Sequence, residues 1–195
     1  MIIEGNDAFD DPCCYPGTTV LKNLLNIQGQ NTLDAFEVEI STLRSEEPLP
    51  EGNFDAAHYC QMHHHLFQDV YEWAGQYRTV RISKGGSAFC YPEYIPAQMD
   101  TLFQGLHGGG IFMDSGLKAF LEEIGLFLSE LNAIHPFREG NGGSQLALIG
   151  LLGAAFVGHP FAFERLDRNT FLPAMITSYF GHREPLILEL RNLLI

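Results

Sequence analysis

Apolar residues recur at helical spacing along most of the chain. The longest series precedes residue 135 and has apolar side chains three or four positions apart, at Leu117, Phe120, Leu121, Ile124, Phe127, Leu128 and Leu131. Such spacing gathers these side chains on one face of a helix. The same pattern predicts further helices over residues 33–43, 54–74, 95–106, 144–157, 169–180 and 185–194. We therefore expect an all-α protein in which apolar helix faces pack together.

Polar and small residues indicate where these helices begin and end. Thr32 and Asn53 are predicted N-caps, because a side-chain oxygen at that position accepts a hydrogen bond from a first-turn N–H. Asp114 or Ser115 is expected to cap the long helix that runs toward residue 135. Gly75 follows the predicted helix 54–74, at the position where a left-handed residue commonly ends a helix.

One short stretch has the alternation of a strand instead. Val80 and Ile82 would face one side of it, and Thr79 and Arg81 the other. Residues after it form a predicted turn, and the chain is expected to return as a partner strand over 88–91. A two-stranded hairpin is marginal by itself and leaves an open edge.

Composition and charge narrow the class of protein. The 195 residues are 46% hydrophobic and 18% charged, which is typical of one ordered domain spanning 1–195. The formal net charge of -13 argues against nucleic-acid binding. The four cysteines have no C-x-x-C spacing, and their thiols are predicted to be reduced. No leader is expected at the start of the chain, so a cytoplasmic protein is predicted. The longest apolar run, 146–157, is too short to cross a membrane.

Four histidines fall in the predicted helix 54–74, namely His58, His63, His64 and His65. No two of them are four residues apart, so no pair of imidazoles would stand side by side on the helix. No acidic residue lies at the spacing of a zinc-binding helix motif. A partly exposed helix surface is therefore expected here, and not a metal site.

The candidate chemistry lies in the string HPFREGNG, which runs from His135 to Gly142. His135 is the natural proton acceptor, because an unperturbed imidazole titrates near neutral pH. Gly140, Asn141 and Gly142 would form a tight turn into a helix N-terminus, where backbone N–H groups favour an anion such as phosphate. A carboxylate beside a phosphate repels it, so Glu139 suits this place mainly if a divalent cation bridges the two.

This string resembles the signature of the Fic family (filamentation induced by cyclic AMP), H-P-F-x-(D/E)-G-N-G-R-x-x-R. The resemblance implies a helical bundle around a central helix–loop–helix site, with an active-site loop over 135–143. It implies transfer of AMP from ATP to a hydroxyl of a target protein. In that role His135 deprotonates the hydroxyl, Glu139 holds Mg²⁺, and Gly140, Asn141 and Gly142 hold the α- and β-phosphates.

A second similarity covers residues 66–78 and the hairpin that follows them. The hairpin corresponds to the family's flap, about 79–92, which pairs with an extended segment of the target protein. The resemblance assigns this docking to Lys84, Gly85, Gly86, Ser87, Ala88 and Phe89. The chain is most similar to small stand-alone, toxin-like members of the family that act in the cytoplasm or after translocation into a host cell.

Small members of the family are held in check by an antitoxin that carries the motif (S/T)-x-x-x-E-(G/N). Thr42 to Glu46 matches its first part, but Glu47 follows where Gly or Asn is required. A separate inhibitory partner is therefore one expectation. The other is that the loss of the arginine which that motif meets has made inhibition unnecessary.

The two arginines of the signature are replaced here by Gly143 and Leu146. In the family they support the outer phosphates, and the loss of two charge-assisted hydrogen bonds would weaken binding or catalysis by about two to four orders of magnitude. Three hypotheses stay open. The chain is an active AMP transferase, or it uses another phosphate-containing donor, or it is a non-catalytic module that docks a target protein.

Overall fold

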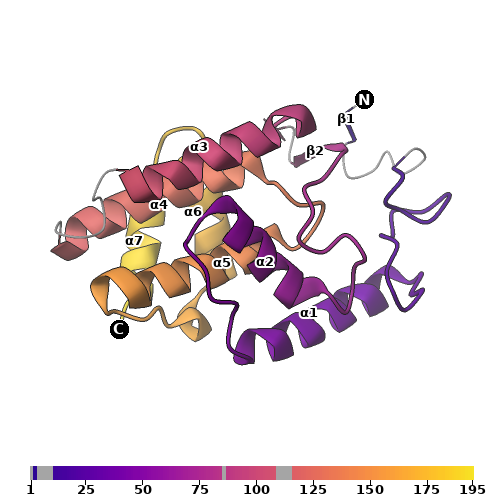
Figure 1. The fold of residues 1–195 in the computed structure, drawn as a ribbon, viewed down its shortest axis with the longest axis horizontal. Coiled ribbons are helices and arrows are strands. Elements are labelled where there is room, and N and C mark those ends of the chain that lie inside the picture. The colour runs from indigo at the N-terminus through magenta and orange to yellow at the C-terminus, as the bar shows by residue number, and fades with distance from the viewer. Residues whose placement is uncertain (1, 4–10, 85–86, 109–115) are drawn as a thin grey trace. The chain divides into compact units, whose positions relative to one another are not determined.

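The computed structural model describes residues 2–3, 11–84, 87–108 and 116–195, and helices dominate this part of the chain (Figure 1). The helices are α1 (Gln30–Glu46), α2 (Ala56–Phe67), α3 (Ile95–Gly108), α4 (Gly116–Ile134), α5 (Asn141–Leu152), α6 (Arg168–Tyr179) and α7 (Glu184–Leu193). The strands are β1 (Ile2–Ile3), β2 (Arg81–Lys84) and β3 (Ser87–Ala88). The predicted all-α class with a small hairpin is confirmed. Among the described residues no helix is long and apolar enough to cross a membrane.

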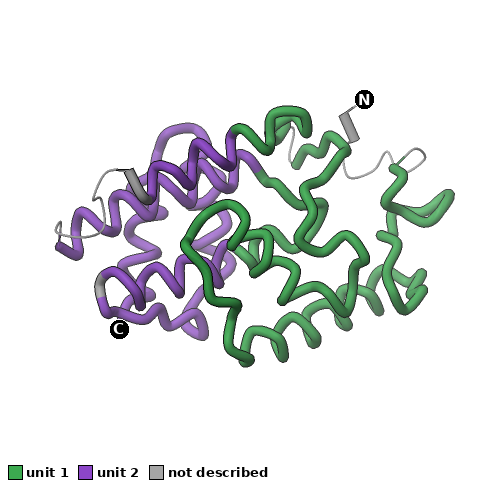
Figure 2. Tube along the Cα trace, viewed as in Figure 1, with its two compact units in different colours: residues 1–97, 135–144 green, residues 98–134, 145–195 purple. Residues whose placement is uncertain are grey.

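The chain divides into two compact units (Figure 2). The first unit consists of residues 1–97 and 135–144, and the second of residues 98–134 and 145–195. The loop that carries the candidate chemistry thus belongs to the first unit, although the chain enters it from α4 and leaves it through α5. The single domain 1–195 expected from the sequence stays a prediction.

In the first unit, α1 packs against α2. Helix α2 is the more deeply buried of the two, with Tyr59 and Met62 fully inaccessible to solvent. The apolar face expected for α1 is only partly realised: Leu33 is buried, whereas Leu43 is 53% exposed. Helix α1 therefore contributes less to the core than its pattern indicates.

Both predicted N-caps in this unit are wrong. Helix α1 begins at Gln30 after Gly29, so Thr32 lies inside its first turn. The cap of α2 is Asp55, whose carboxylate accepts a hydrogen bond of 2.7 Å from the N–H of His58. Two good capping residues lie near one another in this sequence, and the packing of α2 decides between Asn53 and Asp55.

Helix α2 also ends earlier than predicted, at Phe67 and not at residue 74. The chain then turns and reaches Gly75 in a left-handed conformation with φ of 80°. A Cβ atom at Gly75 would lie 2.8 Å from the carbonyl oxygen of Cys60, so only glycine allows this close return to α2.

The predicted hairpin is present, but β2 begins two residues later than predicted, at Arg81, and β3 is shorter than predicted and begins one residue earlier, at Ser87. Strands β2 and β3 are antiparallel, with Ser83 opposite Ala88 and Lys84 opposite Ser87. The sequence did not predict β1, which pairs in parallel with the other edge of β2 and gives the strand order β1-β2-β3. Gly85 and Gly86 at the predicted tip lie outside the described residues.

In the second unit, α4 packs against α6 and α7. The buried face of α4 matches the predicted series from Phe120 onward, whereas Leu117 is 40% exposed. Gly125 allows a close approach to α7, because a Cβ atom there would lie 2.9 Å from Cγ1 of Ile187. The predicted cap of α4 at Asp114 or Ser115 lies outside the described residues.

The other helices agree with the pattern within a few residues. Helix α3 covers the predicted 95–106, and α6 and α7 each begin one residue before the predicted start. Helix α5 begins at Asn141 and stops at Leu152, short of the predicted end at residue 157. The remaining residues, Gly153–Val157, form a wider π-helical turn that ends at the left-handed Gly158.

Candidate active site

His135 follows directly after α4, as the sequence predicts, and is half-buried. Its φ of 49° places the backbone in the left-handed region, which is uncommon for a residue other than glycine. The guanidinium of Arg78 donates from Nε to the carbonyl oxygen of His135 across 2.8 Å. On the ring side, Phe89 of the hairpin stacks on the imidazole with centroids 3.9 Å apart and an interplanar angle of 14°. Both the backbone and the ring of His135 are thus held by residues of the first unit.

Phe137 anchors the loop in the core of the first unit and is fully buried. Its ring stacks on the imidazole of His63 at 3.7 Å and lies 5.4 Å from the ring of Tyr59. Burying a phenyl ring contributes about 1.5–3 kcal/mol of hydrophobic free energy. The loop is therefore attached at its centre, between His135 and Glu139.

Asn141 closes the loop through its side chain. Its Oδ1 accepts a hydrogen bond of 3.0 Å from the N–H of Phe137, and its Nδ2 donates to the carbonyl oxygen of Phe137 across 2.9 Å. The side chain is buried. An amide suits this position because it offers one acceptor and one donor at once. In this structure the side chain of Asn141 shapes the loop, and its backbone N–H opens α5.

Gly140 is required by packing. It has φ of 77°, and a Cβ atom there would lie 2.6 Å from Cε2 of Phe67 and 3.0 Å from Nε2 of His63. Gly142 differs, because a Cβ atom there would meet nothing within 4 Å. Gly142 and Gly143 are exposed at the start of α5. The two glycines of the GNG motif therefore have different roles: one makes room for the core, and the other leaves a face open to solvent.

Glu139 has an exposed side chain, and its Oε1 accepts a hydrogen bond of 3.1 Å from the N–H of Gly140. Its carbonyl oxygen lies 3.0 Å from Nε2 of His63. The N–H of Gly75 donates to Nδ1 of the same imidazole across 2.9 Å, so Nδ1 is the acceptor and Nε2 carries the proton. His63 therefore links the backbone of Glu139 to the turn that follows α2.

The expectation of a partly exposed histidine surface is wrong for His63 and His58, which are 0% and 4% exposed. Burial lowers the pKa of His63 to about 4, so its imidazole is neutral at physiological pH. No group of three or more metal-ligating side chains occurs within the described part of the chain. The pattern of residues indicates only weakly that His63 is buried and links two segments, because its hydrogen-bond partners are distant in sequence.

The first turn of α5 presents backbone donors next to Glu139. The earliest hydrogen bond of this helix runs from the N–H of Ser144 to the carbonyl oxygen of Gly140 at 3.1 Å. An α-helix offers no acceptor to the N–H groups before that point, here those of Asn141, Gly142 and Gly143. Such a turn favours phosphate oxygens through its N–H groups and the helix dipole.

Tyr59 supports this first turn through Ser144. Its phenol and the hydroxyl of Ser144 lie 2.9 Å apart, and both residues are buried. Gly143 faces outward, and a Cβ atom there would make only an ordinary contact of 3.5 Å with Phe67. The surroundings of position 143 therefore leave room for the Cβ atom of a longer side chain.

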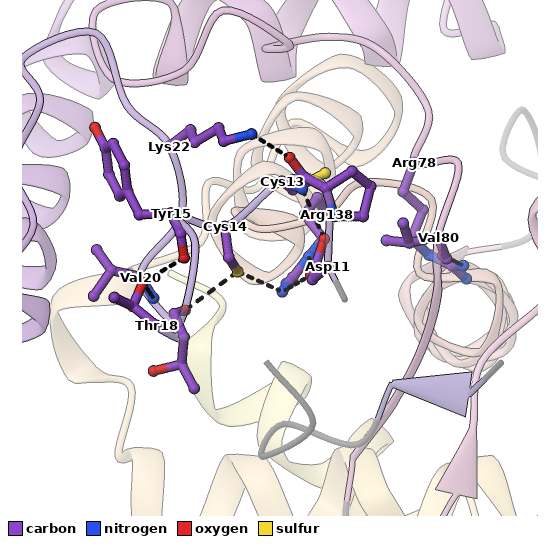
Figure 3. A network of polar contacts seen from close by, with 12 residues as sticks. Asp11, Cys13, Cys14, Tyr15, Thr18, Val20, Lys22, Arg78, Val80 and Arg138 are labelled. Carbon is purple, nitrogen blue, oxygen red and sulfur yellow. Dashed lines mark hydrogen bonds and ion pairs between the residues drawn. The ribbon is translucent and has the colours of Figure 1, made fainter. Parts of the chain in front are cut away.

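Arg138, between Phe137 and Glu139, is paired with the N-terminal segment (Figure 3). Its Nη2 and Nε donate to Oδ2 of Asp11 across 2.7 and 3.0 Å. Burial by itself would raise the pKa of Asp11, but the N–H of Cys13 and the guanidinium of Arg138 stabilise the carboxylate and bring its pKa below the ordinary value. The sequence did not reveal Asp11, which lies 127 positions before its partner.

A second carboxyl group lies near the site without having been predicted. Oε2 of Glu37 on α1 accepts a hydrogen bond from the phenol of Tyr71. Burial raises the pKa of Glu37 to about 7, the Tyr71 hydroxyl opposes this shift, and the negative charge of Glu139 adds to it. The two carboxylates therefore interact electrostatically.

The predicted flap residues are described only in part. Lys84 and Ala88 are exposed, and Phe89 is half-buried against His135. Ser87 pairs with Lys84 through its backbone, whereas Gly85 and Gly86 lie outside the described residues. The structure thus brings Phe89 to the imidazole and leaves Lys84 and Ala88 facing solvent.

Comparison with known proteins matches residues 53–152 to the Fic/DOC family. A probable protein adenylyltransferase from Sinorhizobium fredii is 46% identical over 189 residues, which cover 96% of this chain and 98% of that protein. The protein adenylyltransferase VbhT from Bartonella schoenbuchensis is 35% identical over 181 residues, which cover 91% of this chain but only 38% of VbhT.

Solved structures give the same result for the fold. BepC from Bartonella tribocorum, determined with bound AMPPNP, matches with a TM-score of 0.83 and 25% identity over 94% of this chain and 96% of that chain. The N-terminal Fic domain of an effector protein from Bartonella sp. AR 15-3 matches with a TM-score of 0.85 and 24% identity over 93% and 90%. Both similarities cover almost the whole of each chain.

Proposed function

The chain belongs to the Fic/DOC family, and we propose that it transfers AMP from ATP to a hydroxyl side chain of a target protein. One observation carries the proposal. His135 at the end of α4 and Glu139 four residues later stand on a loop that leads into α5, whose first-turn N–H groups precede the first helical hydrogen bond at Ser144. The relatives named as adenylyltransferases support the same activity over nearly the whole chain.

In this proposal His135 accepts the proton of the target hydroxyl. The hydroxyl oxygen then bonds to the α-phosphorus of ATP, and the bond from that phosphorus to the bridging oxygen breaks, so pyrophosphate leaves with the electron pair. Asn141 and Gly142 hold the α- and β-phosphates through N–H groups of the first turn of α5, and the turn at Gly140 brings the backbone close to them. Most of the acceleration in such a reaction comes from positioning and charge stabilisation.

Magnesium fits the residues present. Glu139 is an exposed carboxylate beside the donors of α5, where its charge would repel a phosphate unless a cation lay between them. Mg²⁺ is commonly bound by one or two carboxylates together with substrate phosphates and waters. Once bound to Glu139, it would neutralise negative charge on the phosphates during transfer.

The flap would present the target protein. We assign this docking to Lys84, Gly85, Gly86, Ser87, Ala88 and Phe89, through strand addition beside the hairpin. The protein would act in the cytoplasm or in a host cell after translocation, and a separate antitoxin would restrain it. An exposed Lys84 and Ala88 beside a half-buried Phe89 support a docking role.

A second candidate keeps the chemistry and changes the donor. Gly143 is exposed and has no side chain to bind an outer phosphate, so a donor that lacks a γ-phosphate would lose least. Leu146 at the position of the second signature arginine favours the same alternative. A non-catalytic docking module would follow if no donor were used.

The test is labelling with ATP that carries a label on the α-phosphate. Purified protein is incubated with a cell lysate and Mg²⁺, and His135→Ala and Glu139→Ala are compared with the exposed control His182→Ala. We expect labelling by the wild type and the control, and its loss in the other two variants. Labelling by His135→Ala at the wild-type rate would overturn the proposal.

Back-substitution separates the three hypotheses. Gly143→Arg and Leu146→Arg are made singly and together, and each form is assayed for Mg²⁺-dependent labelling with α-labelled ATP. Calorimetric titration with ATP, ADP, GTP, UTP and CDP-alcohols identifies the preferred donor, and equal or better binding of ATP would contradict a donor without a γ-phosphate. Strong labelling by the wild type supports transfer from ATP. Labelling only by the variants with restored arginines supports another natural donor. The absence of labelling by every form supports a docking module.

A further inference from the structure

Arg78 is a buried arginine in the segment between α2 and β2, with 4% of its surface exposed. Its guanidinium donates to three backbone carbonyl oxygens: from Nε to His135 at 2.8 Å, from Nη1 to Val80 at 2.7 Å and from Nη2 to Cys90 at 2.5 Å. Its own backbone N–H donates to the carbonyl oxygen of Pro136 across 2.9 Å. Arg78 thus joins three separate segments of the first unit (Figure 3 shows Arg78 beside Val80).

Two of these three acceptors lie at the two ends of the flap. Val80 immediately precedes β2, and Cys90 lies two residues after β3. The third acceptor is the carbonyl of His135, whose backbone is held in the left-handed conformation with φ of 49°. Such a conformation costs about 1–3 kcal/mol in a residue other than glycine and persists only where its surroundings enforce it. The hydrogen bonds to His135 and Pro136 supply part of that enforcement.

Only an arginine can make these contacts together. The guanidinium is planar, and its five N–H donors point in fixed directions, so the three carbonyls must keep one relative geometry. Burial lowers the pKa of Arg78 to about 10, and the nearby charge of Arg138 acts in the same direction. The group still carries its charge at neutral pH, which strengthens its hydrogen bonds to the carbonyls.

A second connection runs from the flap to the imidazole itself. Phe89 precedes Cys90, and its ring stacks on His135 with centroids 3.9 Å apart. The backbone of His135 is therefore attached to the base of the flap through Arg78, and its ring is attached to the end of the flap through Phe89. A displacement of the flap would move both parts of the residue.

We propose that Arg78 is a positioning residue that couples the flap to His135, so that a target strand docked on the flap finds the imidazole already aligned for proton transfer. The inference rests on the proposed function of the flap and of His135. It assigns to Arg78 an effect on the transfer step and none on nucleotide binding, because the contacts that the structure describes for it lie at His135, Pro136 and the two ends of the flap.

The test uses Arg78→Lys, which keeps the charge and loses the fork of donors, and Arg165→Lys at an exposed position as the matched control. Transfer from α-labelled ATP is expected to fall about 100-fold in Arg78→Lys, since a misplacement of about 1 Å can cost that much. Calorimetry with AMPPNP and Mg²⁺ is expected to give the wild-type dissociation constant for both variants. Thermal unfolding establishes that each variant is folded at the assay temperature.

Two readouts do not need activity. Hydrogen exchange should become faster at the amides of 81–84, 88–90 and 137–139 in Arg78→Lys, and should stay unchanged in α6 and α7. The NMR signals of His135 carry a ring-current shift from the stacked Phe89. Phe89→Leu removes that shift while leaving the flap protected, and Arg78→Lys should move the signals in the same direction.

Three outcomes would overturn the inference. They are wild-type transfer by Arg78→Lys, a parallel loss of nucleotide binding and transfer, and unchanged exchange in the flap. If the wild-type protein itself transferred no AMP, the proposed function would fail, whereas the exchange and NMR measurements would still decide whether Arg78 couples the flap to His135.

Discussion

The imidazole of His63 donates a hydrogen bond from Nε2 to the carbonyl oxygen of Glu139 across 3.0 Å, although the two residues are 76 positions apart. The other ring nitrogen accepts from the N–H of Gly75. The neutral tautomer therefore fits both neighbours, and a protonated ring would bring two donors face to face. The geometry of the candidate metal ligand thus depends on a histidine that stays uncharged.

This arrangement predicts a loss of stability in acid. The pKa of His63 is about 4 in the folded protein against an ordinary 6.5, so the unfolded chain binds more protons between these values. The contribution of His63 to the free energy of unfolding should therefore be constant above pH 6.5 and fall as pH decreases toward 4, by up to about 3 kcal/mol. Urea denaturation of wild type and His63→Asn across this range measures the difference in slope. The exposed control His182→Asn should keep the wild-type slope.

The raised pKa of Glu37 predicts the opposite dependence of stability on pH. Its pKa is raised from 4.5 to about 7, so the folded protein binds the extra proton, and this contribution to stability is lost as pH rises from 4.5 through 7. Glu37→Gln keeps an acceptor for Tyr71 and removes the charge. We expect the variant to be more stable than wild type at pH 8, by about 1–2 kcal/mol after solvent screening, and similar to it at pH 4.5. Equal stability at pH 8 would contradict the assignment.

The ion pair between Asp11 and Arg138 should couple the N-terminal segment to the active-site loop. The Asp11 side chain is fully inaccessible and that of Arg138 is 18% exposed, so removal of one partner leaves a poorly solvated charge. Asp11→Asn and Arg138→Met should each cost about 3–5 kcal/mol, and the double variant should cost clearly less than their sum. Lys118→Met, in the exposed pair with Glu122, should change stability by less than about 0.5 kcal/mol. Additive losses would show that the pair contributes little.

The two glycines of the GNG motif should respond differently to alanine. Gly140→Ala would place a Cβ atom 2.6 Å from Phe67 at a positive φ and should cost about 2–4 kcal/mol. Gly142→Ala meets open space, so we expect a change in stability below about 1 kcal/mol. Thermal unfolding compares the two. Alanine keeps the backbone N–H of residue 142, so this variant should lose AMPPNP affinity, at an unchanged melting temperature, through steric contact of its Cβ atom with a phosphate held there.

Periodicity predicted most helices well, because amphipathic spacing is a local property of the chain. The apolar series before His135 gave the buried face of α4, and α6 and α7 start within a residue of their expected positions. Helix ends were predicted less well. Thr32 and Asn53 are good capping residues by type, yet Gly29 and Asp55 occupy the caps, because packing selects among neighbouring candidates.

The sequence by itself determined the family, the helical class and the identity of His135 and Glu139 as candidate groups, because these follow from residue types at fixed short spacings. Only the tertiary structure decided what holds them. Arg78, His63 and Asp11 act on the loop from 57, 76 and 127 positions away. No periodic pattern encodes such contacts, since they arise where buried polar groups of distant segments must satisfy one another's hydrogen bonds.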